Sequence, residues 1–388
     1  MCRHRSSGRR APPTEEVRVS RLRHLHTHDS IKRNDMSQGA EPAGPTKYID
    51  GRPAAELRLD AEDAGRVFTH GQGPDRCDAV GAREASVVLH DGIYHLFYDG
   101  AEPGVGWLAC LATSSDLENW QRHGSVFTYG EPGQRDSHTA TSPWFVRHDG
   151  LWHAYYVGCT RVTEPPGCVP DVPYYTLKAE AEELKGPWRK RYDVEVVSTE
   201  PDTYRSDTAS PGYLFWYAGK LWTFFTCAEN LTRPDGRVIH TRSLGMAHAP
   251  HPDGPWTVLD VPVLPQEEQI ENSSLYHEES NGWWFLFTNH VGMDETWDEW
   301  TDAIWVYWSR DPTQWDPRNK AVVLDGRNCT WSKQCIGMPS AIKVGERLAI
   351  LYDAPGGKRT DHMKRDIGLA WLDLPLSPPG RDQQRPVT

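Results

Sequence analysis

The stretch Ser86-Val-Val-Leu-His-Asp-Gly-Ile-Tyr-His-Leu-Phe-Tyr98 predicts the fold class of this chain. It consists of two short runs rich in apolar and aromatic residues, with Asp91-Gly92 between them. An Asp-Gly pair between two such runs is the strongest short-range signal for a β-hairpin, because these residues tolerate the positive φ of a tight turn. The stretch therefore predicts two antiparallel strands joined by a two-residue turn.

The same hairpin pattern recurs along the chain. Similar runs around a glycine occupy residues 144–156, 213–225, 275–287 and 341–352. The five turn glycines stand 58, 69, 63 and 63 residues apart and are Gly92, Gly150, Gly219, Gly282 and Gly345. About 20 residues after each hairpin a further strand pattern follows, and in the first four copies it ends in a polar turn and a Trp.

Each period thus supplies about four short strands, and a four-stranded sheet repeated along the chain is the pattern of a β-propeller. We predict an all-β fold, a five-bladed β-propeller with four antiparallel strands per blade. Residues 36–388 would form this single domain, and the segment near residues 56–69 would add a strand to the last blade. The 33 Gly and 30 Pro suit a chain with many turns, and most of the 17 Trp are expected to pack within sheets.

Charge is unevenly distributed along the chain. The formal net charge is −12, yet residues 1–35 carry nine Lys and Arg against four acidic residues. We interpret residues 1–35 as a disordered basic arm, or as translated sequence upstream of a start at Met36. No apolar segment follows the basic residues, so they do not form a secretory signal, and we expect a cytoplasmic protein. The acidic remainder argues against nucleic-acid partners, and the absence of a long apolar run argues against a membrane helix.

The eight Cys are too few for a disulfide scaffold in a chain of this length. Two closely spaced pairs, Cys159 with Cys168 and Cys329 with Cys335, could bridge within a loop. No Cys-x-x-Cys occurs, which argues against a structural zinc site.

Carboxylates precede three of the five predicted first strands. In a propeller the first strand of each blade lines the central channel, and ligands bind where these strands begin. The residues at this place include Glu84, Asp207 and Glu271. We therefore expect the three carboxylates to converge on one axis.

The residues around these acids resemble the motifs of family 43 glycoside hydrolases, which are five-bladed propellers related to families 117 and 32. Arg83-Glu84-Ala85-Ser86 is similar to the first-blade motif, Ser142-Pro143 to the second and Glu271-Asn272-Ser273 to the fourth, and Asp207 is the third-blade candidate. The chain departs from the family in having Glu84 in place of Asp, and in placing Asp207 about three residues upstream of the best alignment. The fifth blade has Gly337-Met338 where many members have Gly-His near a central ion, so a channel calcium is not supported and no cofactor is expected.

The resemblance implies two-carboxylate glycoside hydrolysis. Glu84 would be the general base, Glu271 the general acid and Asp207 the group that tunes the acid, with Asp136 as a spare candidate for that tuning. In an inverting enzyme the two carboxyl groups stand roughly 6.5–9.5 Å apart. The acid needs a raised pKa, which burial or a neighbouring carboxylate can supply.

The expected substrate is an oligo- or polysaccharide. Candidate substrate-binding residues lie in the motifs or on stretches near the predicted channel mouth, and they are Arg83, Trp107, Asp136, His138, Trp144, Asn272 and His290. Two other functions stay open at this point, a glycoside phosphorylase and a noncatalytic carbohydrate-binding propeller. The sequence does not indicate the oligomeric state.

Overall fold

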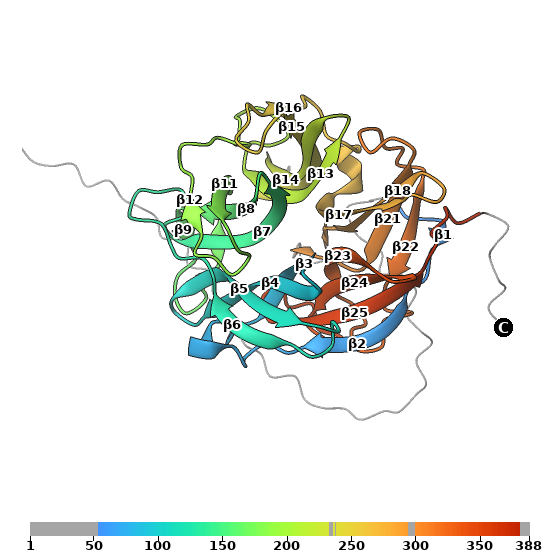
Figure 1. The fold of residues 1–388 in the computed structure, drawn as a ribbon, viewed down its shortest axis with the longest axis horizontal. Helices are drawn as coiled ribbons and strands as arrows, with labels where there is room; N and C mark the ends of the chain where they lie inside the picture. Colours follow the sequence, from blue (N-terminus) through green and yellow to red (C-terminus); the bar gives the residue numbers. More distant parts are fainter. Residues whose placement is uncertain (1–52, 233–235, 237, 294–298, 381–388) are drawn as a thin grey trace, which may run out of the picture. The chain divides into compact units, whose positions relative to one another are not determined.

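The computed structural model describes residues 53–232, 236, 238–293 and 299–380. The chain divides into two units, residues 1–42 and 43–388, and the described residues belong to the second. The predicted basic arm lies outside the described residues. These contain 25 strands and two short 3-10 helices, η1 Pro74–Arg76 and η2 Gln266–Glu268, so the predicted all-β class is confirmed (Figure 1). Neither helix is long and apolar enough to cross a membrane.

Five β-hairpins organise the described residues. They are β3 (Ala82–His90) with β4 (Ile93–Glu102), β7 (Thr139–His148) with β8 (Leu151–Cys159), β13 (Thr208–Tyr217) with β14 (Lys220–Thr232), β17 (Ile270–Glu278) with β18 (Trp283–His290), and β23 (Gly337–Val344) with β24 (Arg347–Ala354). The predicted turn glycines lie at the five turns with φ between 58° and 82°. Asp91, Asp149 and Ala218, each just before a turn glycine, also have positive φ, as in the turns whose twist matches the flanking strands.

Each hairpin is extended by a third strand that pairs antiparallel with its second strand. These third strands are β5 (Gly106–Ser114), β11 (Tyr175–Ala181), β15 (Val238–Ala249), β21 (Ile304–Ser309) and β25 (Asp366–Asp373). A fourth strand pairs with each of them, and these outer strands are β6 (Gln121–Ser125), β12 (Arg189–Lys190), β16 (Thr257–Val258), β22 (Lys320–Leu324) and β2 (Glu62–Phe68). A short parallel pairing of β5 with β7 joins the first two four-stranded units into one sheet.

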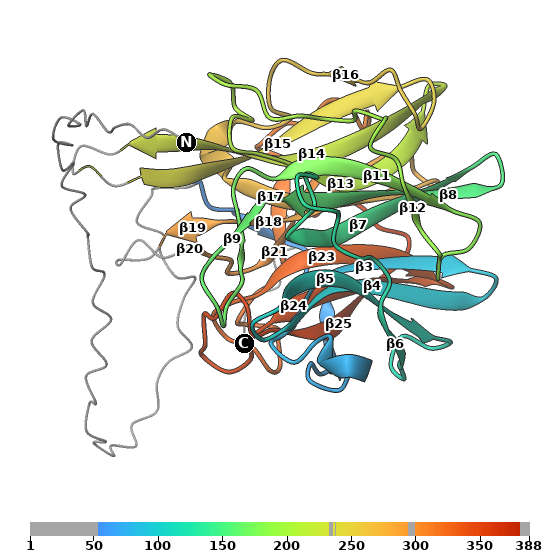
Figure 2. The same cartoon turned by 90° about the vertical axis from the view of Figure 1, so that its left-hand side faces the viewer.

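The remaining strands are short. β1 (Leu57–Arg58) adds in parallel to β22, β9 (Arg161–Val162) pairs with β10 (Pro170–Asp171), and β19 (Gly292–Met293) pairs with β20 (Glu299–Trp300). Figure 2 shows β9, β19 and β20 at the end of the sheets where β14 ends and β15 begins.

The strand closest to the N-terminus completes the sheet closest to the C-terminus. β2 pairs antiparallel with β25, from Glu62 opposite Trp371 to Phe68 opposite Ile367, and the two lie side by side in Figure 1. The prediction that the segment near residues 56–69 adds a strand to the last four-stranded unit is therefore confirmed.

Every first strand carries a β-bulge at the same place. The pairing register shifts between Arg83 and Ser86 in β3, and the other four shifts lie between Thr141 and Trp144, Pro211 and Leu214, Glu271 and Ser274, and Gly337 and Ser340. In four of the five the bulge residue has a left-handed φ, and these residues are Glu84, Ser142, Asn272 and Met338. A bulge re-aims a side chain away from the regular alternation of a strand.

Apolar clusters fill the spaces between neighbouring sheets. One holds Phe285 of β18 with Ile350 of β24, and the next holds Leu351 of β24 with Leu96 of β4. The other clusters connect β5 with β8, β8 with β14, and β15 with β17. The first strands also contact one another in the order β3, β7, β13, β17, β23 and back to β3.

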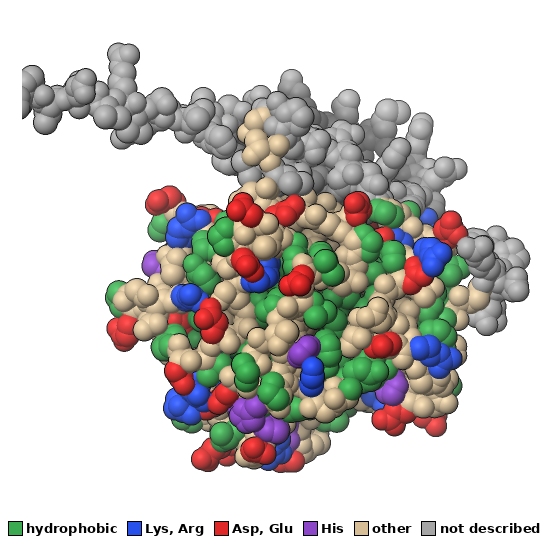
Figure 3. Space-filling model, turned by 90° about the horizontal axis from the view of Figure 1, so that it is seen from above, with side chains coloured by type: hydrophobic (Ala, Val, Ile, Leu, Met, Phe, Trp, Pro, Cys, Tyr) green, Lys and Arg blue, Asp and Glu red, His purple; other side chains and the backbone are tan. Residues whose placement is uncertain are grey.

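The described cysteines form no disulfide. Cys159 and Cys168 are buried and free, and so are Cys329 and Cys335, so neither pair that could have bridged does so. On the face drawn in Figure 3, acidic and basic side chains of the described residues are interspersed rather than gathered in one basic patch.

Candidate active site

A pocket of about 200 Å³ opens beside the bulges of four first strands, β3, β7, β13 and β17. Its lining includes Arg83 and Glu84 of β3, Ser142 of β7, and Glu271 and Asn272 of β17. The structure thus brings two of the three predicted catalytic carboxylates together, from sheets that are far apart in the sequence.

Glu84 is held by partners from three directions. Its carboxylate is in direct contact with the guanidinium of Arg83, and its Oε2 accepts a hydrogen bond of 2.9 Å from Ser142 Oγ. Its backbone N–H donates to Asp353 Oδ2 at 2.7 Å, and Asp353 forms an ion pair of 2.6 Å with the fully buried Arg365. These contacts hold the bulge and the Glu84 carboxylate in place.

Glu271 enters the pocket from the opposite sheet but not from the equivalent position. The bulge registers align Glu84 with Asn272, so Glu271 lies one residue before the matching place. Its Oε1 is 3.7 Å from Arg242 Nε of β15, another residue of the pocket lining. Because the bulges lie at the same place in both strands, the offset comes from the sequence itself: Glu84 is the third residue of β3 and Glu271 the second of β17.

Three predicted substrate-binding residues line the same pocket. Arg83 lies with its guanidinium carbon 5.7 Å from the centre of the Trp107 ring, a cation–π geometry. Trp107 is only 2% exposed, so it forms a packed wall. The third is Asn272, the bulge residue beside Glu271.

Asp207 is not among the residues that line the pocket, although the next residue, Thr208, is. Asp207 Oδ2 lies 3.6 Å from His240 Nδ1 of β15. His240 and Arg242 are two residues apart on this strand and therefore share one face. Two side chains of β15, His240 and Arg242, thus lie between Asp207 and Glu271.

The remaining predicted residues are not brought to the pocket lining. Asp136 is fully buried and binds Tyr156, Tyr192 and Lys190. His138 is exposed, and its Nδ1 lies 3.0 Å from Ser137 Oγ. The other two residues pack against aromatic rings. Trp144 packs edge-on against Tyr213 and lines a separate cavity of about 10 Å³, which Glu84 and Asn272 also line. The buried His290 stacks on Trp305.

Four ionisable residues of the pocket lining were missed by sequence reasoning, and they are Asp99, Tyr174, Arg242 and His362. Asp99 lies in a second strand and Arg242 in a third strand, whereas the three predicted catalytic carboxylates were placed at the starts of first strands. Tyr174 and His362 come from connecting segments. The alternation of β4 could have drawn attention to Asp99, since a charged residue interrupts its apolar run.

The surroundings shift the pKa of two of these missed groups. Burial, followed by the charge of Glu84, raises the pKa of Asp99 well above its usual range. Burial, together with the charges of Arg83, Arg365 and Arg242, lowers the pKa of His362 well below its usual range. Both shifts favour the neutral form of the group, the carboxylic acid of Asp99 and the imidazole of His362.

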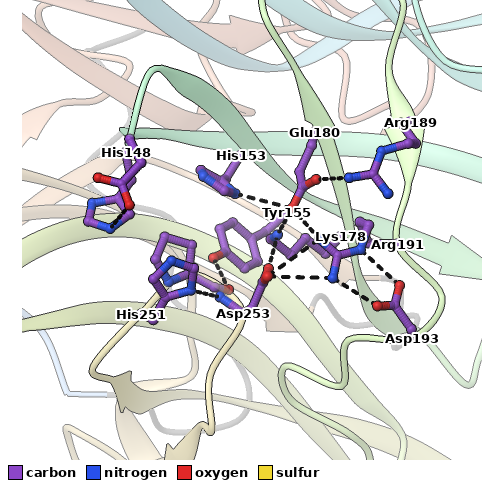
Figure 4. A network of polar contacts seen from close by, with 12 residues as sticks. His148, His153, Tyr155, Lys178, Glu180, Arg189, Arg191, Asp193, His251 and Asp253 are labelled. Atoms are coloured by element: carbon purple, nitrogen blue, oxygen red, sulfur yellow. Dashed lines mark hydrogen bonds and ion pairs between the residues drawn. The ribbon is translucent and has the colours of Figure 1, made fainter.

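Two groups of side chains in the described residues have a spacing that could suit a metal ion, and they are His148, Asp149 and His251, and His153, Glu180 and Asp253. In the second group the Lys178 ammonium contacts both Glu180 and Asp253, and Arg191 contacts both as well (Figure 4). Cations of the chain itself thus balance these carboxylates. None of these residues lines the pocket.

No protein-family model matches the chain, and a search of curated protein sequences finds no significant relative. Solved structures are similar in fold. Zg3597, a family 117 glycoside hydrolase of the marine bacterium Zobellia galactanivorans, has a TM-score of 0.57 and 15% identity, covering 83% of this chain and 94% of that chain. A thermostable family 43 glycoside hydrolase has a TM-score of 0.52 and 13% identity, covering 78% and 92%. An α-L-arabinanase of Cellvibrio cellulosa complexed with arabinohexaose has a TM-score of 0.51 and 16% identity, covering 75% and 91%.

At these identities the likeness establishes a shared fold. The described residues therefore have the all-β fold of β-propeller glycoside hydrolases. The predicted resemblance to families 43 and 117 is confirmed at that level.

Proposed function

We propose that this protein is a glycoside hydrolase that cleaves a glycosidic bond in an oligo- or polysaccharide by an inverting mechanism. The single observation that carries the proposal is the meeting of Glu84 and Glu271 in one pocket of this fold. Two carboxyl groups on either side of a bond are the minimum machinery for glycoside hydrolysis. The arabinohexaose bound by the similar Cellvibrio arabinanase supports a carbohydrate substrate.

Glu84 is the proposed general base. A base must accept a proton from water, and the contacts with Arg83 and Ser142 orient the Glu84 carboxylate for this role. The bulge and the hydrogen bond from its backbone N–H to Asp353 hold the side chain in one direction. This positioning suits a group that must aim one water molecule at the sugar.

Glu271 is the proposed general acid, and Asp207 the group that tunes it. The acid must be protonated when substrate is bound, and the charges around it set how readily it is. Asp207 acts through His240, which shares a face of β15 with Arg242, the neighbour of Glu271. Among the predicted binding residues, Arg83, Trp107 and Asn272 are proposed to touch the sugar because they line the pocket.

The architecture proposed for this site is a five-bladed propeller with four strands per blade. It is supported by the five hairpins with their third and fourth strands, and by the cyclic order of contacts among β3, β7, β13, β17 and β23. Pairing of β2 with β25 would close the last blade with a strand from the other end of the domain.

The function is tested by a screen of aryl glycosides and plant and algal oligosaccharides, each with and without inorganic phosphate. Hydrolysis that does not need phosphate is the expected result. Cleavage that requires phosphate would instead indicate a phosphorylase, and saturable binding without cleavage would indicate a noncatalytic propeller. Product stereochemistry, read by NMR in the first turnovers, distinguishes inversion from retention.

A further inference from the structure

The hydroxyl group of Ser142 lies between two carboxyl groups at the edge of the pocket. Ser142 Oγ is 2.9 Å from Glu84 Oε2 and 2.7 Å from Asp99 Oδ2. The backbone N–H of Ser142 donates to the other oxygen of Asp99, Oδ1, at 2.6 Å. Asp99 is 4% exposed and also lines the pocket.

A count of protons shows that both carboxyl groups cannot be ionised. A serine hydroxyl has one proton and can donate one hydrogen bond, while its oxygen can accept others. If Ser142 donates to one carboxylate, the second carboxyl oxygen at hydrogen-bond distance must itself carry a proton and donate to Ser142 Oγ. Otherwise two oxygens without a proton between them would face each other in a buried site, which is costly.

The surrounding charges decide which carboxyl group keeps the proton. Arg83 is in direct contact with Glu84, and Arg365 forms its ion pair with Asp353. The charge of Arg83 acts on Asp99 as well as on Glu84. Burial and the negative charge of Glu84 both raise the pKa of Asp99, which agrees with a proton on Asp99.

We propose that Asp99 is a positioning residue that remains protonated at neutral pH and acts on Glu84 through Ser142. The Asp99 carboxylic acid donates to Ser142 Oγ, and Ser142 Oγ–H donates to Glu84 Oε2. This relay holds the Glu84 carboxylate in place and keeps a second negative charge away from it. The catalytic consequence rests on the proposed function, whereas the protonation of Asp99 does not.

At two other bulges a neutral side chain accepts the hydrogen bond that Asp99 accepts from the Ser142 N–H, so a charged residue is not required at position 99. The backbone N–H of Asn272 bonds to Thr226 Oγ1, and that of Met338 bonds to Asn289 Oδ1. Each acceptor lies in the second strand of the preceding hairpin, as Asp99 does for Ser142. A neutral side chain therefore satisfies such a bulge, and D99N can be expected to fold.

The protonation state is tested directly by carbon-13 NMR of protein labelled at the aspartate side-chain carboxyl, comparing wild type with D99N at pH 7. The expected difference is one resonance at the chemical shift of a protonated carboxyl, present in wild type and missing in D99N. If the resonance that D99N removes has the shift of an ionised carboxylate, the proposal is wrong. This measurement needs no substrate, so it stays decisive if the proposed function fails.

Thermal unfolding between pH 4 and pH 8 supplies a second test without activity. The unfolded chain releases the Asp99 proton near its ordinary pKa while the folded state retains it, so wild-type stability falls as pH rises above about 4. The Tm of D99N relative to wild type should therefore rise steadily with pH. The control is E180Q: Glu180 is buried with Lys178 and Arg191 as partners and has a lowered pKa, so its deficit should stay constant above pH 5. A constant difference for D99N as well would refute the proposal.

Where a substrate has been found, the pH dependence of kcat separates positioning from simple packing. An amide at position 99 can accept from the Ser142 N–H and donate to Ser142 Oγ, as the protonated acid does. D99N should therefore lose less than tenfold in kcat and should lack the alkaline decline that deprotonation of Asp99 causes, whereas D99A and S142A should lose more. Equal losses in D99N and D99A with an unchanged pH profile would show a merely structural role.

Discussion

Replacing each catalytic glutamate by glutamine is the sharpest test of the proposed mechanism. Glutamine keeps the size of the side chain and removes its ability to exchange a proton. Loss of one acid–base group reduces the rate by roughly 10²–10⁴, which corresponds to a barrier increase of about 2.7–5.5 kcal/mol. We expect losses of this size in kcat for both E84Q and E271Q.

The structure also predicts how the two variants differ in stability. Glu84 accepts from Arg83 and Ser142, and a hydrogen bond to a charged group contributes about 1.5–3 kcal/mol. E84Q should thus lower the free energy of unfolding by an amount in this range. That loss is below the about 5–15 kcal/mol stability of a typical domain, so the variant should remain folded.

Aryl glycosides with different leaving groups assign the two roles. A good leaving group needs little protonation, so E271Q should approach wild-type rates on the most reactive aryl glycosides, while E84Q should stay slow on all of them. Circular dichroism and thermal unfolding check that each variant is folded, and E118Q, a change at an exposed residue outside the pocket, is the matched control with unchanged kcat. Near wild-type rates for both E84Q and E271Q on a substrate that the parent cleaves would refute the mechanism. The opposite leaving-group pattern would exchange the two roles.

Three further outcomes are expected. A variant that begins at Met36 should keep the Tm and the activity of the full chain, and a drop of several degrees would show that the preceding residues belong to the fold. Asp207→Asn should move one limb of the kcat pH profile more than it lowers the maximum, since the group is proposed to tune the acid, and an unshifted profile would contradict that role. Lys178→Met should lower the free energy of unfolding by about 3–5 kcal/mol, measured by urea denaturation, because it leaves the carboxylates of Glu180 and Asp253 without their shared ammonium; a cost below about 1 kcal/mol would show that Arg191 alone suffices.

Local sequence was enough to predict the strands and their turns. Hairpins depend on neighbouring residues, since Asp91-Gly92 and Asp149-Gly150 can adopt the positive φ of a tight turn wherever the chain places them. The repeat interval then implied that each hairpin belongs to a larger sheet. The pairing of β2 with β25 was also predictable, because the last period lacked an outer strand of its own.

The pocket was predictable mainly where its residues lie in short motifs at the start of first strands, as Arg83, Glu84 and Glu271 do, and Trp107 of β5 is the exception. Asp136 belonged to no such motif, and its contacts with Tyr156 and Lys190 bury it away from the pocket lining.

Tertiary structure alone decided the partners of the catalytic groups. Asp99 lies 43 residues before Ser142, and Asp353 lies 269 residues after Glu84. Each nevertheless meets its partner, because the bulge of one sheet packs against the second strand of the neighbouring sheet. Glu84 and Glu271 also reach the pocket from positions that are not equivalent, since Glu84 is the bulge residue of β3 whereas Glu271 precedes the bulge residue of β17. Sequence determines a hairpin because its contacts are between near neighbours. The protonation of Asp99 and the direction of Glu84 depend on contacts between distant segments, and only the packed sheets establish these.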